Sequence, residues 1–233
     1  MEIWQNERLK IIKEILPSVG KNFVLKGGTA LALYYGLDRY SEDIDLDSMI
    51  GNMDITGKLI NPGYKKWELN IKKNTETVFR LMINYGAENE RGDYPLKIEI
   101  SSRNKNLLRE GIYDYKNIDG VNVYSLNEIL KMKIVAFNDR DKIRDFYDLA
   151  FYLNKTPEKF SVNMLRSFKE RMDYKNLDAL ALLLENEFKI NNLGKVEGEK
   201  IVLETYEKLE NLIIDRTRER LNDKNKKNED YER

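Results

Sequence analysis

The spacing of apolar residues changes once along the chain. Before residue 125, apolar and polar positions alternate in short segments, which is typical of half-buried β-strands. From Ser125 onward apolar residues recur every three or four positions, which is typical of amphipathic helices. The change predicts an α/β (α+β) domain over residues 1–124 and a helical bundle over residues 125–221, with the boundary fixed only to within 125–155. Residues 222–233 are poor in apolar side chains, and we expect them to be frayed.

The first domain opens with a predicted helix over residues 2–16, which Pro17 stops. A short buried strand, "FVLK" at 23–26, then runs into Gly27-Gly28, and Thr29 is placed to cap a helix that ends near Gly36. Further strands are predicted at 43–47, 64–72, 76–85 and 95–101, and in a hairpin around Asp119-Gly120.

The second domain begins at "SLNE", residues 125–128, a capping box that predicts a helix to about Asn138. Later helices are predicted at 143–153, from Pro157 after a Thr156 cap, at 177–188 and at 197–221.

Charge gives no global argument for a nucleic-acid or membrane partner. The 40 Lys and Arg residues equal the 40 Asp and Glu residues, so any attraction must come from local patches. No apolar run approaches the roughly 20 residues of a membrane helix, and the N-terminus lacks the layout of a signal peptide. We therefore expect a cytoplasmic protein with no membrane partner.

The chain has no cysteine and no histidine. Disulfides, thiolate nucleophiles, imidazole bases and zinc sites built on Cys or His are thereby excluded. An enzyme of this composition must work with carboxylates, amines and hydroxyls, which favours hard, oxygen-ligated cations such as Mg²⁺.

The segment "DIDLD" holds the first candidate metal ligands. Alternation on a strand projects Asp43 and Asp45 to one face, about 7 Å apart, and sends Ile44 into the core. Two such carboxylates repel one another unless a cation or solvent neutralises them. They predict a site for one or two divalent cations, which Asp47 would extend, although taken alone the pair is also typical of a solvated sheet edge.

The glycine pair before this strand supplies a complementary feature. Without a Cβ, Gly27 and Gly28 let backbone N–H groups approach a phosphate, and the following helix N-terminus adds its positive dipole end. The Thr29 hydroxyl is placed to donate a further hydrogen bond to the phosphate. Taken alone the glycines indicate only a turn, but together with the aspartates they predict a site for a nucleoside triphosphate and its Mg²⁺, without a Walker A lysine.

Two later segments carry further candidates. In "KIEIS", alternation puts Glu99 on one strand face, where it becomes a third metal ligand or a general base if this strand neighbours "DIDLD"; otherwise the face is simply solvated. In residues 131–149, Asp145 and Asp148 share a helix face among several lysines and arginines that are suited to triphosphate charge. Such a charge-dense segment is also typical of a solvated helix laced with ion pairs.

With those residues in view, the chain resembles the AbiEii/AbiGii-type toxins of the nucleotidyltransferase superfamily, which belong to type IV toxin–antitoxin and phage-defence systems. The resemblance lies in "LKGGTALALYYGLDRYSEDIDL" and "LKMKIVAFNDRDKIRDFYDL", in that order. It implies a mixed β-sheet flanked by helices, with a C-terminal helical bundle that contributes to the active-site cleft.

The resemblance also assigns roles. It implies that Gly27, Gly28 and Thr29 contact nucleotide phosphates, helped by Arg39 and Ser41. It implies that Asp43 and Asp45 bind Mg²⁺, or alternatively Mn²⁺. Glu99 would be a third carboxylate ligand, a position that varies among such toxins. The resemblance completes the site with Lys133 and either Asp148 or Asp145, because Asp145 has an arginine nearby with which it could pair instead.

The reaction expected from these features is metal-dependent transfer of a nucleotidyl group from an NTP to an acceptor hydroxyl, with release of pyrophosphate. Related toxins favour a tRNA 3′ end, and residues 97–144 hold ten Lys and Arg against seven Asp and Glu. Alternatives are a small-molecule or protein acceptor, a non-catalytic NTP- or RNA-binding module, and a Mg²⁺-dependent nuclease. A cognate antitoxin is an expected protein partner.

Overall fold

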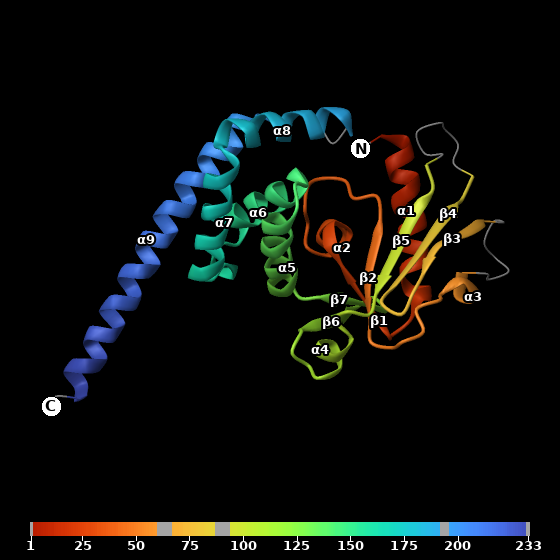
Figure 1. Cartoon of the computed structure of the whole chain (residues 1–233), viewed down its shortest axis with the longest axis horizontal. Helices are drawn as coiled ribbons and strands as arrows, with labels where there is room; N and C mark the ends of the chain where they lie inside the picture. The colour runs from red at the N-terminus through yellow and green to blue at the C-terminus, as the bar shows by residue number, and fades with distance from the viewer. Residues whose placement is uncertain (1, 60–66, 87–93, 192–195, 232–233) are drawn as a thin grey trace. The chain divides into compact units, whose positions relative to one another are not determined.

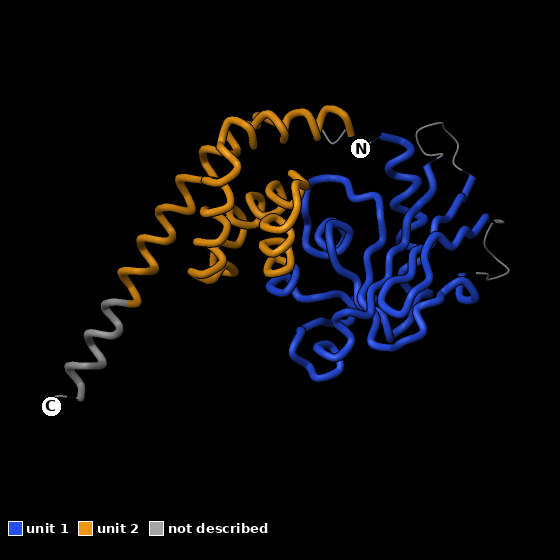
Figure 2. The backbone as a smooth tube through the Cα atoms, in the orientation of Figure 1, with its two compact units in different colours: residues 1–129 blue, residues 130–233 orange. Residues whose placement is uncertain are grey.

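Alternating segments of the first half of the chain form one mixed β-sheet, and the second half is helical (Figure 1). The computed structural model describes residues 2–59, 67–86, 94–191 and 196–231, with side chains to residue 220. It divides the chain into two units, residues 1–129 and 130–233, which Figure 2 shows in blue and orange.

The sheet of unit 1 has seven strands in the order β3-β4-β5-β2-β1-β7-β6. β2 pairs with β5 and β1 with β7 in parallel, and the other neighbours are antiparallel. The strands are β1 (Phe23–Lys26), β2 (Ile44–Ser48), β3 (Glu68–Asn74), β4 (Val78–Asn84), β5 (Leu96–Ser101), β6 (Tyr115–Ile118) and β7 (Val121–Tyr124). Each matches a predicted strand; residues 64–66 of the predicted third strand lie outside the described part.

One face of the central strands is fully buried. The register aligns Leu25 with Leu46 and Leu46 with Ile100, and Ile100 lies opposite Phe79; none of the four side chains is exposed. At about 25 cal/mol per Å², burial of such a row stabilises the sheet strongly. Because side chains alternate, it also fixes which residues of these strands lie on the opposite, polar face.

Unit 1 contains α1 (Ile3–Val19), α2 (Gly27–Tyr34), α3 (Thr56–Leu59) and α4 (Lys105–Arg109). The prediction that Pro17 stops the first helix is wrong, because α1 continues to Val19. Proline removes one hydrogen bond near the helix end, but Leu16 and Val19 are both buried, and their burial offsets that loss. Gly20, with a φ of 88°, ends the helix.

The hairpin predicted at Asp119-Gly120 is confirmed. The two residues join β6 and β7, and both have positive φ, 50° and 84°. Positive φ at both central positions is what a type I′ turn requires, and an Asp-Gly pair tolerates it well.

Unit 2 is built of helices around an aromatic cluster. The rings of Phe137, Phe146 and Phe168 contact one another, with centroids 5.6 to 5.9 Å apart. The division between the units falls within α5, after Ile129. The elements are α5 (Leu126–Asp139), α6 (Ile143–Lys155), the 3₁₀ turn η1 (Pro157–Lys159), α7 (Val162–Lys175), α8 (Leu177–Ile190) and α9 (Gly198–Tyr231).

Two details of unit 2 differ from the sequence analysis. Thr156 caps no α-helix: its hydroxyl donates to the Tyr152 carbonyl, and α7 starts later, where Ser161 accepts from the Met164 N–H. The backbone of α9 is helical to Tyr231, beyond the residue 221 at which we expect the helix to end, since the charged residues after that point include good helix formers. Among the described helices, none combines the length and the apolar character that a membrane span requires.

Candidate functional site

Strand register brings four charged residues into one row across the polar face of the sheet. Asp45 of β2 lies opposite Lys26 of β1 on one side and Glu99 of β5 on the other. Glu99 in turn lies opposite Arg80 of β4. Glu99 is a candidate metal ligand or general base only if its strand neighbours "DIDLD". The structure meets this condition, because β5 is the direct neighbour of β2.

Most of the carboxylates on this face have a basic partner. The Lys97 ammonium lies 2.5 Å from a carboxylate oxygen of Asp43, and the Arg80 guanidinium lies 2.7 Å from one of Glu99. Within the described residues the structure gives the Asp45 carboxylate neither a hydrogen bond nor an ion pair. Burial raises the pKa of Asp45, and although Lys97 counters this, the charges of Asp43 and Glu99 raise it further.

The glycine pair lies directly against these groups. Gly27 has a φ of 74°, and a Cβ built on it would lie 3.2 Å from a carboxylate oxygen of Asp45. A Cβ on Gly28 would lie 2.9 Å from the Ser41 hydroxyl and 3.1 Å from the Arg39 guanidinium. The start of α2 and the acidic strand therefore face each other at van der Waals distance, with room for glycine alone.

The prediction that Thr29 caps α2 is wrong. The N-cap of α2 is Lys26, not Thr29. The Thr29 hydroxyl is buried, donates to the Asp43 carbonyl and lies 2.9 Å from the Ser41 hydroxyl. These bonds tie Thr29 to the entry of β2, and its predicted contact with phosphate stays a prediction. Arg39, itself buried, donates to the Tyr40 carbonyl.

Asp47 is enclosed by hydrogen-bond donors. Its side chain has no exposed surface and accepts from Lys26 at 2.5 Å, Asn104 at 2.7 Å and Tyr124 at 2.8 Å. Burial and the nearby Asp47 charge raise the pKa of Tyr124, so its phenol keeps the proton that it donates. Asp47 does not extend the row of candidate metal ligands, because its oxygens are already occupied.

The candidates of the later motif lie together in unit 2. The Lys133 ammonium lies 2.7 Å from both Asp145 and Asp148, and all three residues are buried. Arg140 adds two hydrogen bonds to Asp145, at 2.8 and 3.2 Å. Although burial opposes it, the charges of Lys133 and Arg140 lower the pKa of Asp145, which therefore pairs with an arginine as well as with the lysine.

The donor chemistry of the acidic face fits a magnesium ion. Carboxylate oxygens are the ligands that Mg²⁺ prefers, and Asp45 is a partly buried carboxylate that makes no ion pair with any described residue. Within the described part of the chain, no group of three or more acidic, Cys or His side chains is already gathered closely enough to hold a metal ion. Asp43 and Glu99 instead contact Lys97 and Arg80.

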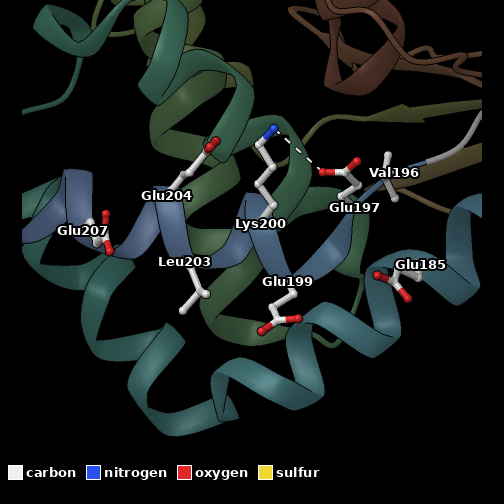
Figure 3. A pocket seen from close by; sticks show the side chains of 8 residues that line it. All are labelled: Glu185, Val196, Glu197, Glu199, Lys200, Leu203, Glu204 and Glu207. Atoms are coloured by element: carbon white, nitrogen blue, oxygen red, sulfur yellow. Dashed lines mark ion pairs between the residues drawn. The ribbon is translucent and has the colours of Figure 1, made fainter.

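A separate groove of about 750 Å³ lies along α8 and α9 (Figure 3). Five glutamates and Lys200 line it, and none of the predicted site residues does. The side chains diverge: Glu199 extends to one side of α9, while Lys200 and Glu204 extend to the other. Such divergence is typical of solvated helix faces, so the groove does not change the choice of site.

The sequence pattern places Lys97 on the same strand face as Glu99, but it predicts no role for Lys97, Lys26 or Arg80. Lys26 directly precedes the glycine pair, and Lys97 lies two residues before Glu99, so strand alternation alone places them on this face. Arg80 had no local signal, since only the β4–β5 register brings it to Glu99.

Comparisons with known proteins bear on the family and the fold. The family model "Nucleotidyl transferase AbiEii toxin, Type IV TA system" matches residues 11–233. The crystal structure of JHP933 from Helicobacter pylori is 27% identical and covers 95% of this chain and 98% of its own, with a TM-score of 0.79. The nucleotidyltransferase toxin MenT4 from Mycobacterium tuberculosis is 16% identical over 93% of this chain and 88% of its own, with a TM-score of 0.53, a likeness of fold alone. Comparison with curated proteins gives no match.

Proposed function

Because the chain belongs to the AbiEii family of nucleotidyl transferase toxins of type IV toxin–antitoxin systems, we propose that it moves a nucleotidyl group from an NTP to an acceptor hydroxyl in a Mg²⁺-dependent reaction. The observation that carries the proposal is the close approach of Gly27 to Asp45, where a Cβ on the glycine would lie 3.2 Å from a carboxylate oxygen. It sets a helix N-terminus, which favours phosphate, against a carboxylate that makes no ion pair with any described residue.

Each group of the acidic face has a task in this proposal. Asp43, Asp45 and Glu99 would hold Mg²⁺, with Mn²⁺ as an alternative; when bound, the ion offsets phosphoryl charge and lowers the pKa of an attacking hydroxyl. The N–H groups of Gly27 and Gly28 bind phosphate oxygens. Their contribution is positioning and electrostatics.

A tRNA 3′ end is the acceptor that we favour. The family assignment supports a toxin, and a polynucleotide acceptor suits the surplus of basic residues over 97–144. A cognate antitoxin is the expected protein partner. Small molecules and protein hydroxyls are the alternative acceptors, and a non-catalytic module is the alternative function.

The catalytic role of Lys133, Asp145 and Asp148 stays a prediction. The contacts within unit 2 show that Lys133 neutralises both aspartates in the absence of ligand. Both aspartates contact the same ammonium at 2.7 Å, so Asp148 and Asp145 both stay candidates for the residue that acts in the reaction.

The test is transfer of label from each α-³²P NTP, with Mg²⁺, to total tRNA, total protein or aminoglycosides as acceptors. Asp45→Asn removes the central carboxylate with little change of volume. Asp119→Asn is the matched control, because it removes a carboxylate of the same unit from a turn that asparagine also tolerates.

We expect wild type and Asp119→Asn to label tRNA, and Asp45→Asn to lose the activity by at least about 10²-fold. If the label appears in protein or in the aminoglycoside instead of tRNA, the acceptor is a different molecule, but the reaction is still nucleotidyl transfer. Equal labelling by Asp45→Asn and wild type would contradict the proposed site.

A further inference from the structure

We propose that Lys26 is a phosphate-binding residue of the nucleotide site and that Asp47 is its positioning residue. The inference rests on the proposed function and adds a cation that neither the motifs nor the comparisons assign. It starts from the Lys26 ammonium, 2.5 Å from a carboxylate oxygen that is wholly buried.

Lys26 lies where a phosphate of the proposed substrate would be. It is the last residue of β1 and the N-cap of α2, so Gly27 follows it directly. In the sheet it lies opposite Asp45, and its charge acts on the pKa of that carboxyl group. Its side chain is 25% exposed, so ammonium protons that Asp47 does not take can reach a ligand.

The three basic side chains of this face pair with different kinds of carboxylate. Lys97 and Arg80 pair with Asp43 and Glu99, the carboxylates proposed to take up Mg²⁺, so their contacts depend on whether the ion is bound. Lys26 pairs with a carboxylate outside that set. Its position is therefore independent of metal occupancy, as electrostatic preorganisation requires.

Hydrogen bonds from two further residues fix the position of the Asp47 carboxylate. Asn104 and Tyr124 each donate to it, and they come from segments 57 and 77 residues away in sequence. A buried carboxylate is stabilised by such donors, and charge-assisted bonds are the strongest of them. The lysine is thus fixed by a network that spans β1, β2, β7 and the residue that precedes α4.

The experiment measures NTP uptake by titration calorimetry with Mg²⁺, and KM and kcat by label transfer, for four variants. These are Lys26→Met, Asp47→Asn, the double variant, and Lys169→Met as control. Lys169 is 23% exposed and pairs with an aspartate on α7, which matches Lys26 in exposure and pairing. The double variant removes both charges at once and so keeps the test valid if a single variant fails to fold.

We expect Lys26→Met to weaken NTP binding by about 10- to 100-fold, the loss of one charge-assisted hydrogen bond, and Lys169→Met to bind as wild type. Asp47→Asn should weaken binding in the wild-type background but change it by less than about twofold in the Lys26→Met background, because it acts through the lysine.

Two results would overturn the inference while leaving the proposed function in place. One is wild-type NTP affinity in Lys26→Met alongside intact label transfer. The other is an equal effect of Asp47→Asn with and without Lys26, which indicates a purely structural carboxylate. Absence of NTP uptake and of label transfer in the wild-type protein would overturn both proposals together.

Discussion

Four glycine-to-alanine substitutions separate backbone strain from contact at the proposed phosphate site. Gly27 has a φ of 74° and faces Asp45, whereas Gly120 has a φ of 84° and nothing within 4 Å of a built Cβ. Gly28 has no such φ, but a Cβ built on it would lie 2.9 Å from the Ser41 hydroxyl, and Gly57 of α3 has neither feature. A substitution therefore adds backbone strain and a close contact at Gly27, strain alone at Gly120, a close contact alone at Gly28, and neither at Gly57.

The magnitudes follow from these differences. A left-handed φ costs a residue with a Cβ about 1–2 kcal/mol, so Gly120→Ala should lose that much in free energy of unfolding. Gly27→Ala should lose at least as much, since its methyl group also presses on Asp45. Gly28→Ala should lose about 1–3 kcal/mol by overpacking against Ser41. Gly57→Ala should gain about 0.4–1 kcal/mol.

The assays are urea unfolding followed by circular dichroism, and label transfer per folded molecule. Gly120→Ala and Gly57→Ala should transfer label as wild type does. Gly27→Ala and Gly28→Ala should lose about 10²-fold, because small misplacements at a reacting centre have effects of that size. If Gly27→Ala matches Gly120→Ala in both stability and transfer, the glycine serves the turn alone and the proposed phosphate site is wrong.

Two further predictions concern the charged clusters. Because burial raises the pKa of Asp45 above the ordinary 3.8, the folded state binds this proton more tightly than the unfolded state, and stability falls as pH rises from about 3.8 through the raised pKa. Asp45→Asn should therefore melt above wild type at pH 7 in EDTA by scanning calorimetry, and a lower melting temperature would contradict the burial argument. Lys133→Met should lower the free energy of unfolding by about 3–5 kcal/mol in urea, because Asp145 and Asp148 lose a shared buried counter-ion. The control Asp141→Asn, an exposed partner of Lys175, should show no change, and equal losses in the two variants would refute the argument.

The alternation of apolar and polar residues was sufficient to predict the acidic face. Ile44 and Ile98 had to be buried, so Asp45 and Glu99 had to lie on the other side of their strands. Pairing of the two strands was a condition at that stage, and the register of β2 with β5 confirms it. Local patterns determine a side chain's face well because the period of a strand is fixed by its geometry.

The alternation of apolar and polar residues did not predict which residues contact each polar side chain of this face. By pattern Asp47 belongs with Asp45, yet Asn104 and Tyr124 enclose it from distant segments. The position of Thr29 likewise suggested a cap, while its hydroxyl bonds to the carbonyl of Asp43. In both cases a non-local contact decides the role, and such contacts depend on strand order, which a single sequence specifies only through the completed fold.

The carboxylates of the acidic face divide by what neutralises them. Asp47 is buried and fixed, whereas Asp43 and Glu99 pair with Lys97 and Arg80, whose side chains are 29% and 42% exposed. Ion pairs of that exposure contribute little, about 0–1 kcal/mol, so their exchange for a divalent cation costs little. If Mg²⁺ replaces them as proposed, the freed lysine and arginine would remain beside the site, where a triphosphate could pair with them. Mg²⁺ and NTP should therefore bind cooperatively, each tightening the other's dissociation constant by the same factor in calorimetry, and independent binding would refute this exchange.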